Sequence, residues 1–409
     1  MRILLINRNH YIDGGADRVY LNTGELLKDN NYEVAYFSTQ NEKNLDSDYS
    51  SFFVKNINPK SAGIAQKLIS VNKYLYNTDA SKKLSKLILQ FNPDIAHIHL
   101  FYGALSASIL STLKKHKIPI VITIHDYRLL CPANAMLDRH GKICEKCKNN
   151  RFYNCTIKRC SGGNLFNSSI ITVEAYIRQF AIVPLKLINH FIFVSQFSLN
   201  KHISFDNRYS HKSSHLYNFT DSPTNESFIK GDYLLYYGRL SREKGLINLI
   251  NTVKRTNTKL KIAGTGPQKE EIINEIKAFN NIEYVGFKSG EELNELIMNC
   301  SFVVVPSEWY ENNPMTIVEA FSLGKPAIGS NIGGIPELVS DDTGIIFESG
   351  NVFSLSDAIY HAETIGIDDY YRISNNCLKF SRKHFSSKNH LQSLIKLYKS
   401  IINDCKESI

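Results

Sequence analysis

Two bases follow a short apolar run in the second half of the chain. The run Tyr233–Tyr237 leads into Gly238, Arg239 and, five residues on, Lys244. Arginine offers a bidentate cation and lysine a point cation, and this pair suits a diphosphate. A surface loop with incidental bases is the alternative. The segment predicts a phosphate site at the end of a strand.

Two glutamates lie further along the chain, around a predicted helix start. Glu311 falls in a loop, and Glu319 falls about two turns later inside the helix. We expect Asn313 to be the N-cap, Pro314 the first helical residue and Gly324 the C-terminal stop. Either glutamate alone could be an exposed surface residue, so the pair indicates a functional site only together with the neighbouring motifs.

Glycine turns end several predicted strands, at Gly14-Gly15, Gly264-Thr265-Gly266 and Gly333-Gly334. Glycine lets backbone N–H groups approach an anion at a helix N-terminus, but tight turns also need glycine for steric reasons. None of these turns has the full G-x-G-x-x-G pattern, which counts against a nicotinamide oxidoreductase.

Histidines end two predicted strands of the first half. His97 and His99 alternate onto one face, where packing or cleft lining explains them better than metal binding, because no third ligand is evident. His125 follows the strand Ile120–Ile124, where doubly wound folds bind their ligands. It could act as an acid or base, donate a hydrogen bond to a sugar hydroxyl, or be structural.

A cysteine cluster follows His125, and one pair in it has the C-x-x-C spacing of a metal knuckle. Four of the five thiolates could hold a structural zinc ion, although one knuckle is a weaker signal than two. The apolar run at the start of the chain is too short for a signal-peptide core, so we expect reduced thiols and a cytoplasmic protein. The cluster comprises Cys131, Cys144, Cys147, Cys155 and Cys160.

These residues require strands and helices to position them, and the chain supplies two alternating series of both. At 409 residues, with 43% hydrophobic and 21% charged residues, it suits two α/β domains. We expect an N-terminal domain over 1–218 with a Cys-rich insertion at 131–160, a C-terminal domain over 219–370, and terminal helices over 371–409 that pack back on the N-terminal domain. No transmembrane helix is expected.

The formal net charge is +9, and the excess is local. Residues 55–90 hold seven lysines against Asp79, and residues 142–159 hold six bases against Glu145. Such patches favour anionic partners, with nucleic acid and an anionic membrane surface as candidates beside a merely solvated surface.

The motifs from Gly14-Gly15 to Gly333-Gly334-Ile335-Pro336-Glu337 together resemble glycosyltransferase family 4, over essentially the whole chain. The most specific part is the E-x7-E motif, Glu311 to Glu319. The resemblance implies the α/β GT-B fold: two Rossmann-like, doubly wound domains facing a cleft, with a C-terminal helix crossing back to the N-terminal domain. It also implies sugar transfer with retention of configuration and no cofactor for catalysis.

The resemblance implies roles for single residues. Arg239 and Lys244 would hold the diphosphate of a nucleotide-sugar donor, and Glu319 would accept hydrogen bonds from the ribose. His125 and Glu311 would be the catalytic residues beside the transferred sugar. The other donor-binding residues would be Gly15, Gly264, Gly266, Asn312, Asn313 and Pro314.

The segment Thr123 to Cys160 is similar to a subset of the family from bacterial polysaccharide gene clusters. This similarity implies a glycan acceptor. Family context and the basic N-terminal face together point to a lipid-linked acceptor at the inner face of the plasma membrane. Many members have Gly and Phe where this chain has Asn312-Asn313, so UDP-sugars and GDP-mannose both remain open as donors.

Two other functions compete with this interpretation. A sugar-nucleotide epimerase would share the diphosphate site, but the E-x7-E segment and the basic N-terminal domain favour a transferase. A basic nucleic-acid-binding protein is suggested by net charge alone, and the acid and glycine motifs at strand ends disfavour it, so no nucleic acid partner is expected.

Overall fold

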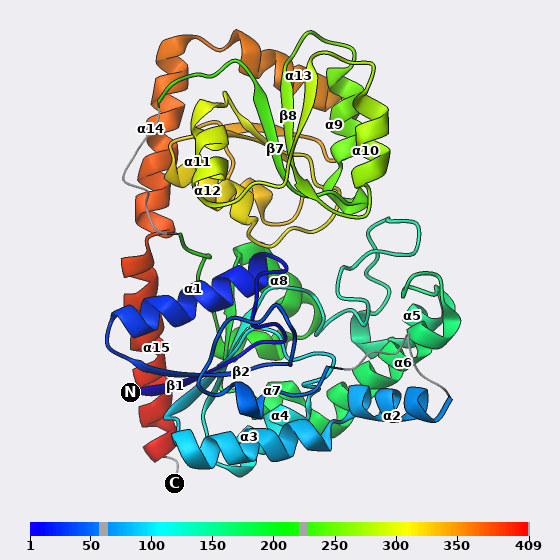
Figure 1. The fold of residues 1–409 in the computed structure, drawn as a ribbon, viewed down its shortest axis with the longest axis vertical. Helices are drawn as coiled ribbons and strands as arrows, with labels where there is room; N and C mark the ends of the chain where they lie inside the picture. Colours follow the sequence, from blue (N-terminus) through cyan, green and yellow to red (C-terminus); the bar gives the residue numbers. More distant parts are fainter. Residues whose placement is uncertain (57–63, 221–227, 408–409) are drawn as a thin grey trace.

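The computed structural model describes residues 1–56, 64–220 and 228–407, and its two sheets each contain six strands. The first sheet has the order β2-β1-β3-β4-β5-β6 and the second has the order β12-β11-β10-β7-β8-β9 (Figure 1). All the strand pairs named in these sheets are parallel. The expected pair of doubly wound α/β domains is confirmed.

The strands of the first sheet are β1 Arg2–Ile6, β2 Glu33–Phe37, β3 Ile95–Ile98, β4 Ile120–Ile124, β5 His190–Phe193 and β6 Ser213–His215. Those of the second are β7 Leu234–Arg239, β8 Leu260–Thr265, β9 Ile282–Gly286, β10 Val303–Val305, β11 Ala327–Ser330 and β12 Gly344–Phe347. The predicted division at residues 218 and 219 lies between the two sheets, and part of the predicted linker, 221–227, lies outside the described residues.

Helices connect the strands and cover both faces of each sheet. Those of the N-terminal half are α1 Gly15–Asp29, α2 Ile64–Leu75, α3 Thr78–Phe91, α4 Ser108–Lys115, α5 Tyr153–Ile157, α6 Leu165–Tyr176, α7 Pro184–Leu187 and α8 Gln196–Phe205. The C-terminal half has α9 Leu246–Val253, α10 Lys269–Ile276, α11 Gly290–Asn299, α12 Met315–Ser322 and α13 Val352–Thr364, followed by α14 Ile367–His384 and α15 Ser387–Glu407. A π-helical segment, η3, continues α6 over Ile177–Ile182.

Strand β6 is missing from the sequence-based expectation because it has no apolar run. Its residues are Ser213, Ser214 and His215, all partly exposed, and it pairs only with β5 at the edge of the first sheet. An edge strand with little burial gives no hydrophobic periodicity to detect.

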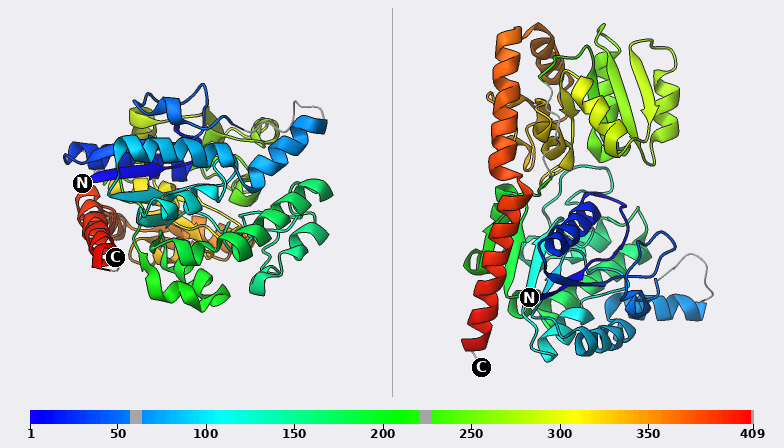
Figure 2. Two further views of the ribbon diagram at one scale, coloured as in Figure 1. Left: turned by 90° about the horizontal axis from the view of Figure 1, so that it is seen from below. Right: turned by 60° about the vertical axis from the view of Figure 1, so that its left-hand side comes forward.

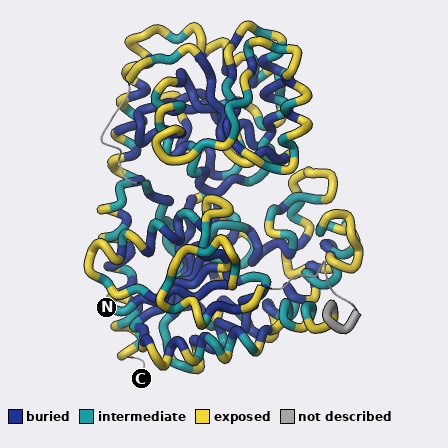
Figure 3. Tube along the Cα trace, viewed as in Figure 1, coloured by how far each residue is buried: buried dark blue, intermediate teal, exposed yellow. Residues whose placement is uncertain are grey.

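Alternation along the strands separates the core of each domain into two layers. In β1, Leu4 and Ile6 join the cluster that contains α3 and α4, whereas Ile3 and Leu5 join the cluster that contains α1 and α15. Buried residues accordingly concentrate along the sheets in both halves (Figure 3). Sheets buried on both faces explain why their strands read as continuous apolar runs.

The two terminal helices pack on different domains. Helix α15 lies along the N-terminal half, where Leu394 and Tyr398 are buried against Leu5. Helix α14 instead packs on α12 of the C-terminal half through Ile373 and Cys377 (Figure 2). The expectation that residues 371–409 all return to the N-terminal domain is therefore wrong for α14, although the C-terminal helix does cross back. No helix in the described ranges has the length and apolarity to span a bilayer.

Strand order fixes where ligands should bind. In the second sheet the chain leaves β7 on one side toward β8 and returns on its other side as β10, so the carboxyl ends of β7 and β10 flank a topological switch point. In the first sheet β1 and β3 do the same. Open α/β sheets bind ligands at such points.

Buried histidines make the fold sensitive to acid. His97 joins β3 to α15, because its Nδ1 contacts the Tyr398 hydroxyl at 2.5 Å and its Nε2 contacts the Thr123 hydroxyl at 2.7 Å. Burial lowers the pKa of His97 to about 3 and the pKa values of His202 and His390 to about 4.

We predict that the free energy of unfolding falls as the pH drops from about 6.5, the ordinary histidine pKa, toward 4. Above that window both states are neutral, whereas within it the unfolded chain binds protons first. Thermal unfolding from pH 7.5 to 4.5 measures the effect. His97→Asn should flatten the dependence, and the same change at the exposed His211 should not. An unchanged melting temperature between pH 7.5 and 5 would contradict the prediction.

Candidate functional site

Glu311 is a buried carboxylate at the carboxyl end of β10. Its Oε1 accepts hydrogen bonds from Lys244 Nζ at 2.6 Å and from the Ser307 hydroxyl at 2.7 Å. Burial alone would raise the pKa of Glu311, but the Lys244 ammonium and these hydrogen bonds outweigh burial and lower it. The site therefore contains an ionised carboxylate paired with a cation.

Arg239, the other predicted base, has no such partner. Arg239 ends β7 and is exposed, and no carboxylate pairs with its guanidinium among the described residues. Lys244 lies in the turn Arg242–Lys244 that follows the same strand. The structure thus places an unpaired arginine and a paired lysine at one strand end, beside the switch point of the second sheet.

Glu319 contacts the opposite domain. It lies in α12, with 15% of its side chain exposed, and forms an ion pair with Arg18 of α1. Burial raises the pKa of Glu319, and Arg18 together with Tyr237 opposes that shift. Arg18 was not among the predicted site residues, although its position one turn after Gly14-Gly15 is a usable signal.

His125 follows β4 and lies beside a second histidine. Its Nε2 is 2.9 Å from Nδ1 of His99, and the two rings stack with centroids 5.1 Å apart. Burial lowers the pKa of His125 to about 3, so the imidazole is neutral at pH 7. A neutral ring fits a hydrogen-bonding role better than a proton-donating one.

Asn312 and Asn313 connect the two halves. Asn312 Nδ2 donates to the His125 carbonyl oxygen at 2.7 Å, and Asn313 Oδ1 accepts from the Asn218 backbone N–H at 2.8 Å. The predicted N-cap role of Asn313 is wrong: Pro314 is the cap of α12, and the Asn313 side chain is used in this contact instead. Within the described chain, Asn312 Oδ1 and Asn313 Nδ2 are buried without hydrogen-bond partners.

The glycines at the strand ends differ in what surrounds them. A Cβ on Gly264 would lie 1.9 Å from the Gly238 carbonyl oxygen, so this glycine is needed for β7 and β8 to approach each other. Gly266 is similarly crowded by the Leu240 backbone, whereas Gly15 meets only Met315 at 3.6 Å. Gly15 is therefore the more open of the predicted donor-binding glycines.

Glu337 makes a further contact between the halves and was not among the predicted site residues. Its carboxylate accepts from the backbone N–H groups of Gln196, at 2.8 Å, and of Phe197, at the start of α8. A carboxylate at a helix N-terminus is favoured by the helix dipole. The nearby Gly334 N–H donates to the Glu311 carbonyl oxygen at 2.7 Å, so it is already used within the loop.

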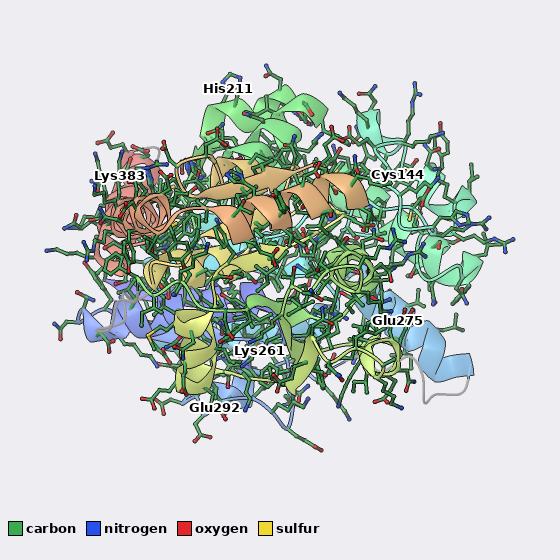
Figure 4. All side chains as sticks on the ribbon, turned by 90° about the horizontal axis from the view of Figure 1, so that it is seen from above. Cys144, His211, Lys261, Glu275, Glu292 and Lys383 are labelled. Atoms are coloured by element: carbon green, nitrogen blue, oxygen red, sulfur yellow. The ribbon has the colours of Figure 1, made fainter. Side chains whose placement is uncertain are left out.

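Three of the five predicted zinc ligands, Cys147, Cys155 and Cys160, share the small core of α5, α6 and the loop before them, which we call the projecting subdomain. Cys144 lies in the same projection from the N-terminal half (Figure 4), whereas Cys131 belongs to the core of the N-terminal domain. Burial raises the pKa of Cys147 to about 12 and also raises that of Cys131. Within the described ranges, no three His, Cys, Asp or Glu side chains have an arrangement that could hold a metal ion. The zinc ion at Cys131, Cys144, Cys147, Cys155 and Cys160 stays a prediction.

Comparison with known families explains this arrangement. The family model for Glycosyltransferase Family 4 matches residues 13–222, more than half of the chain, and that for Glycosyl transferases group 1 matches residues 220–379. The chain belongs to glycosyltransferase family 4. It is an enzyme that transfers sugars, as the family's name states.

Relatives and solved structures agree with this assignment. An uncharacterized glycosyltransferase of Methanocaldococcus jannaschii, MJ1178, is 26% identical over 410 residues, covering 98% of this chain and 99% of the relative. Sucrose-phosphate synthase from Thermosynechococcus elongatus superposes with a TM-score of 0.70 at 16% identity, covering 98% and 99% of the two chains. Anabaena Alr3699/HepE in complex with UDP and glucose gives 0.69 at 16% identity, covering 98% and 100%. The glycosyltransferase has the GT-B fold.

The ion pair at Glu311 predicts different effects for the two bases of this glycosyltransferase. Lys244→Met should lower the free energy of unfolding by about 1–3 kcal/mol, because it leaves a buried carboxylate unpaired. Arg239→Met removes only an exposed cation and should stay within about 0.5 kcal/mol of the wild type. Urea unfolding of the unliganded protein measures both.

A double substitution tests the cause. Glu311→Gln should recover part of the stability lost in Lys244→Met, because the uncompensated charge is then absent. Equal stability losses for Lys244→Met and Arg239→Met, or no recovery in the double variant, would contradict the ion-pair explanation.

Proposed function

We propose that this glycosyltransferase moves a sugar from a nucleotide-diphosphate donor, a UDP-sugar or GDP-mannose, to a glycan acceptor with retention of configuration. The observation that carries the proposal is the placement of Arg239 and Lys244 at the carboxyl end of β7, beside the switch point and next to buried Glu311. Two cations at this point suit a diphosphate, which gains negative charge as the sugar departs.

In this proposal the Lys244 ammonium has two alternative anionic partners, Glu311 and the donor diphosphate. In the unliganded protein its ammonium pairs with Glu311. A diphosphate offers it a stronger concentration of negative charge, and the exposed Arg239 supplies the bidentate contact. The two bases together would stabilise the leaving group without a metal ion, so no cofactor enters the proposed reaction.

The nucleoside and the sugar would find polar partners on both sides of the domain interface. Glu319 would accept hydrogen bonds from the ribose once Arg18 moves away from it. Asn312 Oδ1 and Asn313 Nδ2, which lack partners in the described structure, would bind sugar hydroxyl groups. His125, neutral and held by His99, would lie beside the reacting carbon from the opposite domain.

Retention of configuration would then follow from front-face attack. Glu311 Oε1 already accepts hydrogen bonds from Lys244 and Ser307. An oxygen held in this way suits a residue that positions the sugar, and it suits a nucleophile less well. We therefore favour departure of the nucleotide and attack by the acceptor hydroxyl on the same face, within one ion pair, with the hydroxyl proton passing to the departing diphosphate oxygen. Separation of the two domains would admit the donor, and their closure would keep water out.

The acceptor in this proposal is a lipid-linked glycan, and the process is the synthesis of a bacterial surface polysaccharide at the inner face of the plasma membrane. Two relatives support this context. A 41.2 kDa protein in the cps region of Klebsiella pneumoniae is 27% identical over 172 residues, covering 41% of this chain. A lipopolysaccharide 1,2-N-acetylglucosaminetransferase of Salmonella typhimurium is 29% identical over 123 residues, covering 26% of this chain.

Thermal stabilisation of the purified protein by UDP, GDP, ADP and their sugar conjugates tests the donor site. We expect one nucleotide to stabilise the protein, by about 2.7 kcal/mol at a hundredfold excess over its dissociation constant. Arg239→Ala and Lys244→Ala should both abolish the shift, although only the second lowers the stability of the unliganded protein. A folded protein that no nucleotide stabilises would overturn the proposal.

A further inference from the structure

Helix α6 and the π-helical segment η3 bury polar side chains where a helix of a globular protein normally buries apolar ones. Ser168, Thr172, Glu174 and Arg178 are all buried, beside the apolar Ala175 and Ile182. Glu174 pairs with Arg178 at 2.9 Å and with Arg128 at 3.3 Å. The one acid and the one base of the segment 165–182 are therefore neutralised inside the protein.

The opposite face of the same segment is apolar. Phe166 is 64% exposed, Val173 46% and Phe180 65%, whereas Ile177 packs partly against the domain core. The three exposed residues recur every seven positions, about two helical turns, so they form one stripe along the segment. Amphipathic helices of globular proteins present the reverse orientation to water.

Two neighbouring helices extend the stripe into a patch. Helices α5 and α2 both pack against α6, on the side of the N-terminal half away from α15 (Figure 1). Ile157 of α5 is exposed, as are Leu68 and Ile69 of α2. We call the exposed residues Leu68, Ile69, Ile157, Phe166, Val173 and Phe180 the α6 patch. Exposed apolar side chains gathered on packed helices mark a candidate site of interaction.

The charges of residues 142–186 that form no ion pair have one sign. Exposed bases flank α5 and follow η3, namely Lys146, Lys148, Arg151, Arg159 and Lys186. The acids between residues 142 and 186 are Glu145 and Glu174, and both are in ion pairs, Glu145 with Lys201 at 2.7 Å. Apolar side chains among unpaired positive charge match the interface of an anionic bilayer, where apolar groups enter the acyl region and bases meet the headgroups.

The same charges disfavour a second copy of the chain as the occupant. A twofold contact through the α6 patch would bring the two sets of bases together, because such a contact pairs each surface with itself. Like charges across an interface oppose association.

We propose that the α6 patch docks the enzyme on an anionic lipid bilayer, with Phe166, Val173 and Phe180 as its apolar anchors. The inference rests on the proposed function, in which the acceptor is lipid-linked. The subdomain that carries the patch also reaches the site: the Tyr310 hydroxyl donates to Glu145 at 2.9 Å, and Tyr310 precedes Glu311. Docking through this subdomain places the donor-site loop near the membrane surface.

Flotation of the full chain with vesicles tests the proposal. We expect binding to phosphatidylcholine vesicles that contain about one third phosphatidylglycerol, weakened by salt near 0.5 M and absent from pure phosphatidylcholine. The triple variant Phe166→Asn, Val173→Asn, Phe180→Asn should bind the anionic vesicles at least about tenfold more weakly. Phe353→Asn, which removes an exposed phenylalanine from α13, should bind like the wild type.

Other results would overturn the docking proposal. Absence of wild-type binding to anionic vesicles would do so, as would full binding by the triple variant. A wild-type dimer in light scattering that becomes monomeric in the triple variant would assign the patch to a second copy instead. Nucleotide-induced stabilisation is measured separately on each variant: it shows that the variant is folded, and it distinguishes failure of the donor site from failure of membrane docking.

Discussion

Parallel pairing in both sheets places all their carboxyl strand ends on one edge, and these two edges face each other. This constraint determines the site, because a loop that follows β4 then meets a loop that follows β10. His125 and Asn312 are 187 residues apart in sequence and share a hydrogen bond of 2.7 Å. Neither sheet alone contains both the cations of β7 and the histidine of β4. The candidate site of this glycosyltransferase therefore lies at the interface of its two domains.

Several polar contacts cross this interface, beside the aromatic contacts of Tyr310 with Tyr127 and Phe197. Glu319 meets Arg18, Glu337 meets the start of α8, and Asn313 meets Asn218. Polar contacts between domains can exchange with water and with a ligand at little net cost, whereas an apolar core cannot separate. Helix α15 supplies the permanent connection, since its apolar side chains are buried in the N-terminal core while α14 stays with the C-terminal domain. This division suits domains that open and close around a donor.

The projecting subdomain differs from the two sheet domains in the kinds of side chain that it buries and exposes. Its helix α6 buries an ion pair and exposes phenylalanines, which would be unfavourable in water without a partner. Burial of Glu174 between two arginines neutralises the charge and leaves the outer face free of acids. The same subdomain contacts Tyr310, so the part of the chain that carries the α6 patch is connected to the loop that carries Glu311.

The sequence by itself determined what depends on local pattern: the apolar runs of β1 to β4, the glycine turns after the strands, and the loop and helix that carry Glu311 and Glu319. A strand in a sheet that is buried on both faces has consecutive apolar residues, so these elements could be predicted. Only the tertiary structure decided that Arg18 pairs with Glu319, that Asn313 binds Asn218 rather than capping α12, and that α14 stays on the C-terminal domain. Each of these contacts joins segments far apart in the chain, and a single sequence carries no local signal for a partner that is chosen by packing. Strand β6 was missed for the related reason that an exposed edge leaves no apolar pattern.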